Sequence, residues 1–133
     1  ARPPVAPVLL RFRGRILSIA GSDSSGGAGI QADLKTFSAL RVYGASVITA
    51  ITAQNTRTVA AVEAVSPAMI GAQLDAVFGD LDIRAVKIGM LATPEVIDAV
   101  AQASASGTSS TMIASSAPML IHRNFGCLAF GVA

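Results

Sequence analysis

The residues best suited to hold a ligand lie in a glycine-rich turn. An apolar segment, 16–20, precedes the turn and predicts a short strand, and apolar residues at helical spacing follow it over 30–40. The turn contains four glycines: Gly21, Gly26, Gly27 and Gly29. Glycines let the backbone adopt positive φ and approach a ligand closely, and the free N–H groups at a helix start favour a polar or anionic group. The pattern therefore predicts a cradle for a small polar ligand.

Two known phosphate-binding patterns can be compared with this turn. A P-loop requires a lysine directly after its last glycine, but Gly27 follows Gly26, so that hypothesis fails. A dinucleotide fingerprint fits Gly27, Gly29 and Ala32. That fold also needs an acid at the end of the next strand to hold the ribose hydroxyls, and the next apolar run ends in Gln54. NAD binding therefore stays only as a secondary hypothesis.

Further strands and helices must position this turn. Ala45–Ala53 and Ala85–Met90 are apolar runs typical of strands buried on both faces, and 59–65 is a weaker extended segment. Ser66-Pro67 and Thr93-Pro94 each predict the start of a helix, with a hydroxyl residue as N-cap and proline at the first helical position. This order of elements predicts an α/β fold with right-handed crossovers and a parallel sheet.

The carboxyl ends of the predicted strands carry the polar residues. Parallel α/β sheets bind ligands in the crevice beyond those ends. The ends are Gly21–Asp23, Gln54–Asn55 and Gly89–Met90. We therefore expect these three segments to converge on one site.

Composition narrows the class of function. A chain of 133 residues suits one domain, and 52% hydrophobic with 14% charged residues suits a buried sheet. The net charge of +2 hides an acidic balance of −3 over 16–102, where five basic residues face eight acids. Sparse aromatics and scattered basic residues argue against a nucleic-acid partner, and no apolar run is long enough to span a membrane. The single cysteine, Cys127, fits a reducing compartment, so we expect a cytoplasmic protein.

Three segments together carry a family likeness: AGSDSSGGAGIQADLKTFSAL at 20–40, SVITAITAQNT at 46–56 and VKIGML at 86–91. They closely resemble the N-terminal half of the hydroxymethylpyrimidine/phosphomethylpyrimidine kinases of thiamine biosynthesis, in the ribokinase-like superfamily. The resemblance implies a ribokinase-like three-layer parallel sheet with flanking helices, here truncated. It divides the chain into a basic, proline-rich extension (1–15), the N-terminal half of a kinase domain (16–102) and a divergent tail (103–133).

The resemblance also implies an activity: transfer of phosphate from ATP, with Mg²⁺, to hydroxymethylpyrimidine and its monophosphate, by an enzyme that is a homodimer. It places Gly21 and Ala28 against the pyrimidine. Gln54 would pair with the aminopyrimidine edge, since an amide presents one donor and one acceptor in a plane; otherwise it is an ordinary loop glutamine. No residue is expected to bind a resident metal ion.

Two further residues, Met90 and Asp23, have two interpretations each. Met90 either packs its thioether on the pyrimidine face or is a core methionine. Asp23 either accepts a hydrogen bond from the substrate hydroxymethyl group or caps the following helix. Asp33 on that helix is expected on a solvated face, together with Lys35. The role of Lys87, within a predicted buried strand, is left open.

The tail from residue 103 onwards raises the question of activity. The resemblance places the ATP site and a catalytic cysteine in the C-terminal half of these kinases, and Gly126-Cys127 resembles part of their Gly-Thr-Gly-Cys loop. Cys127 is thus the one candidate for catalysis, and the other catalytic residues are unknown. Ser109–Ser116 resembles a further buried strand that lacks the family's Asp and Pro. Two alternatives are a catalytically inactive pyrimidine-binding or dimerising remnant, and an unstable product whose sheet ends at 85–90 with an unpaired edge.

Overall fold

The computed structural model describes residues 12–91, 93–106 and 111–114, and within them a sheet of five strands lies between helices. The elements in chain order are β1 (Arg15–Asp23), α1 (Gly29–Ala39), β2 (Tyr43–Gln54), β3 (Val59–Ala64), α2 (Pro67–Asp80), β4 (Ala85–Ile88), α3 (Pro94–Ser106) and β5 (Thr111–Ala114). The strand order is β3-β2-β1-β4-β5, with β3 antiparallel to β2 and every other pair parallel. The predicted α/β fold with its parallel sheet is confirmed.

The sheet continues beyond β4, although one hypothesis expected it to end there. β5 pairs in parallel with β4, from Ala85 opposite Thr111 to Ile88 opposite Ala114. The expectation of an unpaired edge at β4 is therefore wrong, because β5 occupies that edge. β5 lies inside the segment that was compared with a buried strand, and α3 continues past residue 102 to Ser106.

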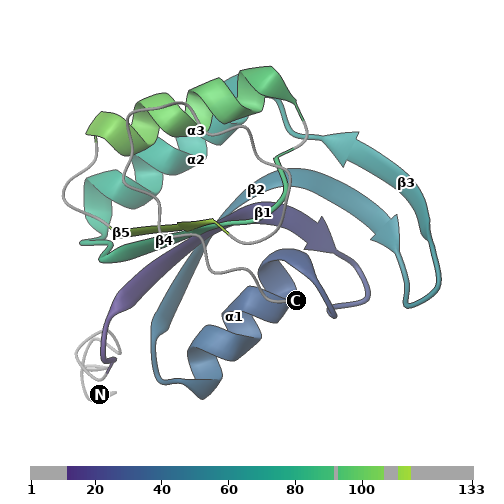
Figure 1. Ribbon diagram of the computed structural model, residues 1–133, viewed down its shortest axis with the longest axis horizontal. Helices are drawn as coiled ribbons and strands as arrows, with labels where there is room; N and C mark the ends of the chain where they lie inside the picture. The colour runs from purple at the N-terminus through teal and green to yellow at the C-terminus, as the bar shows by residue number, and fades with distance from the viewer. Residues whose placement is uncertain (1–11, 92, 107–110, 115–133) are drawn as a thin grey trace, which may run out of the picture.

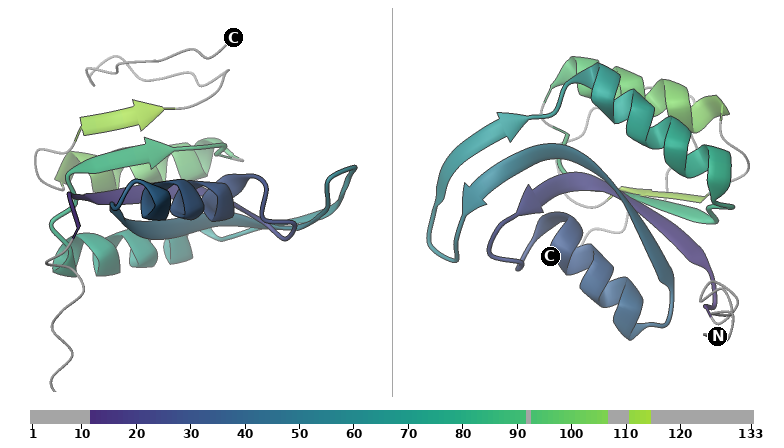
Figure 2. Two further views of the ribbon diagram at one scale, coloured as in Figure 1. Left: turned by 90° about the horizontal axis from the view of Figure 1, so that it is seen from below. Right: turned by 180° about the vertical axis from the view of Figure 1, so that it is seen from behind.

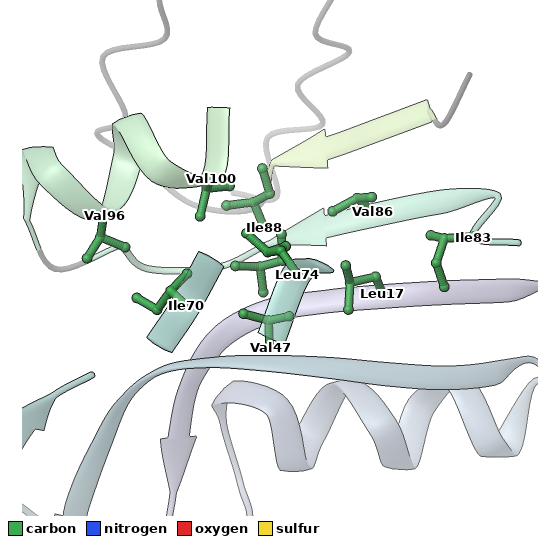
Figure 3. Packing of buried hydrophobic residues seen from close by; sticks show 10 residues of the cluster. Leu17, Val47, Ile70, Leu74, Ile83, Val86, Ile88, Val96 and Val100 are labelled. Atoms are coloured by element: carbon green, nitrogen blue, oxygen red, sulfur yellow. The ribbon is translucent and has the colours of Figure 1, made fainter. Parts of the chain in front are cut away.

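Helices cover both faces of the sheet. Figure 1 shows α1 on one face and α2 with α3 on the other, and Figure 2 shows the same three layers from two further sides. The side of the sheet toward α2 and α3 carries the apolar core, in which Leu17 and Val47 of adjacent strands are fully buried against Ile70 and Leu74 of α2 (Figure 3). Each such side chain contributes about 1.5–3 kcal/mol when buried, so this layer holds α2 and α3 against the sheet.

The helix starts agree with the sequence signals. Ser66 is the N-cap of α2, where its Oγ accepts a hydrogen bond from the Met69 N–H at 3.2 Å, and Pro67 follows it. Thr93 Oγ1 accepts from the Val96 N–H at 3.3 Å at the start of α3. In the described part of the chain, no helix is long and apolar enough to cross a membrane.

The end of β2 and all of β3 form a hairpin that curves away from the helical layers (Figure 1). Every residue of β3 is exposed. The exposed apolar side chains of this hairpin include Ile51, Val59 and Val62, at 55%, 50% and 57% exposure. Gln54 lies at the tip end of β2, so the hairpin carries one of the predicted site residues away from the packed core.

Candidate functional site

The turn after β1 is shaped by a bulge and by two glycines with positive φ. Ala20 pairs with Ile48 and Ser22 with Ile51, so one extra residue of β2 is accommodated opposite Gly21. Gly26 and Gly29 adopt φ of +79° and +56°. At Gly29 a side chain is excluded, because a Cβ there would overlap the carbonyl oxygen of Gly21. The turn is thus folded back so that the start of α1 lies directly against the end of β1.

Asp23 holds this turn together from its centre. Its side chain is 4% exposed. One carboxylate oxygen accepts from the N–H and the hydroxyl of Ser25, at 2.8 and 2.7 Å. The other accepts from the N–H groups of Gly27 and Ala28, at 3.0 and 2.8 Å. The Ser25 hydroxyl and then these backbone N–H groups lower the pKa of Asp23 below its usual 3.8, against an opposing effect of burial.

The capping interpretation of Asp23 is therefore wrong in detail. The N-cap residue of α1 is Ala28, and no side chain caps that helix. Asp23 instead binds donors within the turn that precedes the helix. Its role as acceptor for a substrate hydroxyl stays a prediction, and a ligand would have to replace one of four donors that already fill the carboxylate.

Gln31 clamps the turn from the first turn of α1. Its Oε1 accepts from the Asp23 N–H at 2.8 Å, and its Nε2 donates to Ser22 Oγ at 2.7 Å. Both ends of one amide are used, so Gln31 fixes the exit direction of β1. Gln31 was not predicted as a site residue; its only sequence signal is a polar side chain directly after the apolar helix position Ile30.

Gln54 lies beside the same turn and is joined to it by hydrogen bonds. The Ser24 hydroxyl donates to the Gln54 carbonyl at 2.5 Å and accepts from the Gln54 N–H at 2.7 Å. The Thr52 hydroxyl lies 2.7 Å from the Ser22 carbonyl and 3.1 Å from Gln54 Oε1, and these two acceptors share its single proton. Within the described residues the Gln54 Nε2 has no hydrogen-bond partner, so this half-buried amide retains a free donor.

The end of β4 meets the end of β1 on its other side. The Gly89 N–H donates to the Ile19 carbonyl at 2.8 Å, which continues the pairing one residue past β4. A Cβ at Gly89 would lie 2.8 Å from the Ala20 Cβ, so the two backbones approach closely there. Met90 follows with 66% of its surface exposed, and its carbonyl lies 3.4 Å from the buried Thr49 hydroxyl. Met90 is thus not a core methionine.

The three predicted strand ends lie on the same side of the sheet, at the carboxyl ends of β1, β2 and β4, with Met90 level with Thr49 of β2 and Gln54 five residues farther along that strand. Gly21 and Asp23 end β1, Gln54 is bound to Ser24 of the same turn, and Met90 follows the Gly89 contact with β1. Ala28 is exposed at the start of α1, where its N–H is taken by Asp23. Contact of these side chains with a pyrimidine stays a prediction. Cys127 lies outside the described residues.

One polar cluster was missed by sequence reasoning. Asp33 of α1 does not lie on a solvated face: its Oδ2 accepts from Lys87 Nζ at 2.8 Å and from the fully buried Ser18 hydroxyl at 2.6 Å. The Lys87 and Asp33 side chains are only 21% and 16% exposed. This cluster ties α1 to β1 and β4 beneath the turn. The sequence signal was Lys87 itself, a charge inside an apolar strand that required a partner.

Sequence comparison relates the chain to known proteins. The sequence profile of phosphomethylpyrimidine kinase matches residues 23–122. A hydroxymethylpyrimidine/phosphomethylpyrimidine kinase of Rhizobium meliloti (strain 1021) is 75% identical over 85 residues, which cover 64% of this chain and 32% of that protein. The matched stretch therefore spans about a third of the length of this curated relative.

Solved structures show the same architecture. A phosphomethylpyrimidine kinase from Clostridium difficile 630 superimposes with a TM-score of 0.74 at 54% identity, over 77% of this chain and 44% of that chain. A pyridoxal kinase from Staphylococcus aureus in complex with AMP-PCP and pyridoxal gives a TM-score of 0.68 at 34% identity, over 76% and 37% of the two chains.

Proposed function

This chain belongs to the phosphomethylpyrimidine kinase family, and from that premise we propose that it serves in phosphorylation of hydroxymethylpyrimidine and its monophosphate by ATP. Within that reaction the described residues would form the side of the pocket that holds the pyrimidine. The observation that supports this most directly is the bonded pair of the Gly21 turn and Gln54, at the sheet edge where α/β proteins bind ligands.

Gln54 would form hydrogen bonds with the polar edge of the aminopyrimidine. Its free Nε2 donor suits a ring nitrogen, and a remaining lone pair on Oε1 suits the adjacent exocyclic amine. A site built on such paired hydrogen bonds rejects analogues that lack them, because its own polar groups would then be left unpaired. Met90, exposed beside the same edge, would offer a polarisable thioether to one face of the ring.

ATP would be the second substrate. The Staphylococcus aureus pyridoxal kinase described above was solved with AMP-PCP, an ATP analogue, which supports a nucleoside triphosphate as the phosphate donor. In residues 12–91, 93–106 and 111–114, no three His, Cys, Asp or Glu side chains gather to hold a metal ion. Mg²⁺ would arrive with ATP, since this ion is commonly held by one or two carboxylates together with the phosphates of the substrate.

A coupled assay tests the proposal. The purified chain is incubated with 4-amino-5-hydroxymethyl-2-methylpyrimidine and Mg-ATP, and ADP release is followed, while calorimetry measures binding of the pyrimidine alone. Turnover well above background supports phosphorylation by this chain. Binding without turnover supports the alternative of an inactive pyrimidine-binding chain, and absence of both overturns the assignment.

We further propose that two copies of the chain associate through the β2–β3 hairpin. The exposed apolar side chains of Ile51, Val59 and Val62 support this, since exposed apolar residues on an edge hairpin favour association. Sedimentation velocity of the wild type and of Val62→Lys measures it. A wild-type dimer that the substitution shifts to monomer supports the hairpin interface, whereas a monomeric wild type contradicts it.

A further inference from the structure

We propose that Ser24 is a positioning residue for Gln54. Its hydroxyl fixes the end of β2 beside the Gly21 turn, so that the Gln54 amide faces the ligand in one orientation. The inference rests on the proposed function, because it assigns Gln54 to the pyrimidine edge. It adds a second residue to that recognition, one that does not itself contact the ligand.

The Ser24 hydroxyl bonds to the backbone of Gln54 in the way that a neighbouring strand would. The last backbone pair of β1 with β2 is Asp23 opposite Thr52. Beyond it, both backbone groups of Gln54 on that side are taken by one hydroxyl, which donates at 2.5 Å and accepts at 2.7 Å. Ser24 thus extends the pairing of two segments that are thirty residues apart in sequence.

Besides Ser24, the Thr52 hydroxyl holds the end of β2 against the turn, since it lies 2.7 Å from the Ser22 carbonyl. On its other side the end of β2 pairs with β3, whose residues are all exposed, and the register shifts between Ala53 and Gln54. A hairpin end of this kind moves readily unless its backbone is bonded to the body of the domain. The Thr52 hydroxyl adds a contact to Gln54 Oε1, but at 3.1 Å and with its proton shared with Ser22.

A purely structural role for Ser24 predicts that loss of its hydroxyl changes only the overall stability of the chain. Ser24 is exposed, so loss of its hydroxyl would cost the whole fold little. A positioning role instead concentrates the effect on Gln54. The backbone N–H of Gln54 would lose its protection from hydrogen exchange, and pyrimidine affinity would fall although the fold remains.

The experiment compares four full chains: wild type, Ser24→Ala, Ser24→Thr and the control Ser38→Ala. Ser38 is an exposed hydroxyl residue at the far end of α1. For each chain, NMR measures the exchange rate of the Gln54 N–H, calorimetry measures the Kd for 4-amino-5-hydroxymethyl-2-methylpyrimidine, and urea gives the unfolding midpoint. We expect Ser24→Ala to speed exchange at Gln54 and raise Kd, each by about tenfold, since a lost hydrogen bond of ordinary strength corresponds to that factor.

Ser24→Thr keeps the hydroxyl and should restore both values, and Ser38→Ala should match the wild type throughout. An unchanged exchange rate and Kd in Ser24→Ala, or a loss that Ser24→Thr does not recover, overturns the positioning role. A wild-type chain that fails to bind the pyrimidine overturns the proposed function, and with it the ligand side of this inference. Wild-type binding with Gln54 exchange unaffected by Ser24→Ala overturns the positioning role alone.

Discussion

Gly29 is the position at which a single methyl group should do most damage to the candidate site. It opens α1 with φ of +56° and lies against the backbone of β1. A Cβ in Gly29→Ala would overlap the Gly21 carbonyl oxygen and lie 3.1 Å from the Gly21 carbonyl carbon and 3.5 Å from the Asp23 nitrogen. These are backbone atoms, so no side-chain rotation relieves the overlap.

Two costs add in this variant. A left-handed backbone conformation costs an L-residue about 1–2 kcal/mol. Inserting a methyl group into a filled space costs a further 1–3 kcal/mol or so. We therefore expect Gly29→Ala to lower the free energy of unfolding by about 3 kcal/mol, which is large against a typical total of about 5–15 kcal/mol. Urea unfolding followed by circular dichroism measures the difference.

Gly71→Ala provides the matched control. Gly71 lies inside α2, and a Cβ there meets no atom within 4 Å. Alanine in a helix interior is favoured over glycine, so we expect Gly71→Ala to raise the free energy of unfolding by about 0.5–1 kcal/mol. A Gly29→Ala variant as stable as the wild type, or an equal loss of stability in both variants, would contradict the close packing of α1 against β1 at the turn.

Three further outcomes follow from the site. Lys87→Met leaves the partly buried Asp33 carboxylate without its cation and should lower the free energy of unfolding by about 2 kcal/mol. A double-mutant cycle with Asp33→Asn should show that the two residues are coupled, whereas additive losses of stability would contradict the ion pair. The lowered pKa of Asp23 means that its contribution to stability is fully present above pH 3.8 and is lost as pH falls through the folded-state value; acid unfolding curves of the wild type and Asp23→Asn should diverge above that window and converge below it. Gln54→Glu removes the amide donor and should weaken pyrimidine binding by about 10- to 100-fold in calorimetry with the urea midpoint unchanged, whereas an unaltered Kd would remove Gln54 from the site.

Local sequence signals were sufficient for most of the architecture. The strands β1, β2 and β4 are largely apolar because both faces of a parallel sheet are covered, and that pattern can be recognised from the sequence. The helix starts at Ser66 and Thr93 carry their own capping chemistry, so their positions were predicted to the residue. Once the parallel strands are predicted, their carboxyl ends are known as well, so the contact between the Gly21 turn and Gln54 was foreseeable.

Contacts made by polar side chains across long sequence distances were not foreseeable. Asp33 follows apolar Ile30 on an amphipathic helix, and a carboxylate there is normally solvated. Its burial depends on Lys87, which lies 54 positions away. Asp23 presents the same difficulty in another form, since a helix cap and a turn cap require the same residue type and differ only in which N–H groups come within reach.

The candidate site and the core are stabilised by different kinds of interaction. The core side of the sheet is fixed by many apolar contacts, so no one of them decides the geometry. The ligand side is fixed by a few polar side chains: Asp23 accepts from donors of its own turn, Gln31 joins α1 to the end of β1, and Ser24 joins the turn to the end of β2. A substitution at the exposed Ser24 should therefore separate binding from folding, whereas a core substitution should impair both together, and this difference can be measured by comparing Kd with the urea midpoint for each variant.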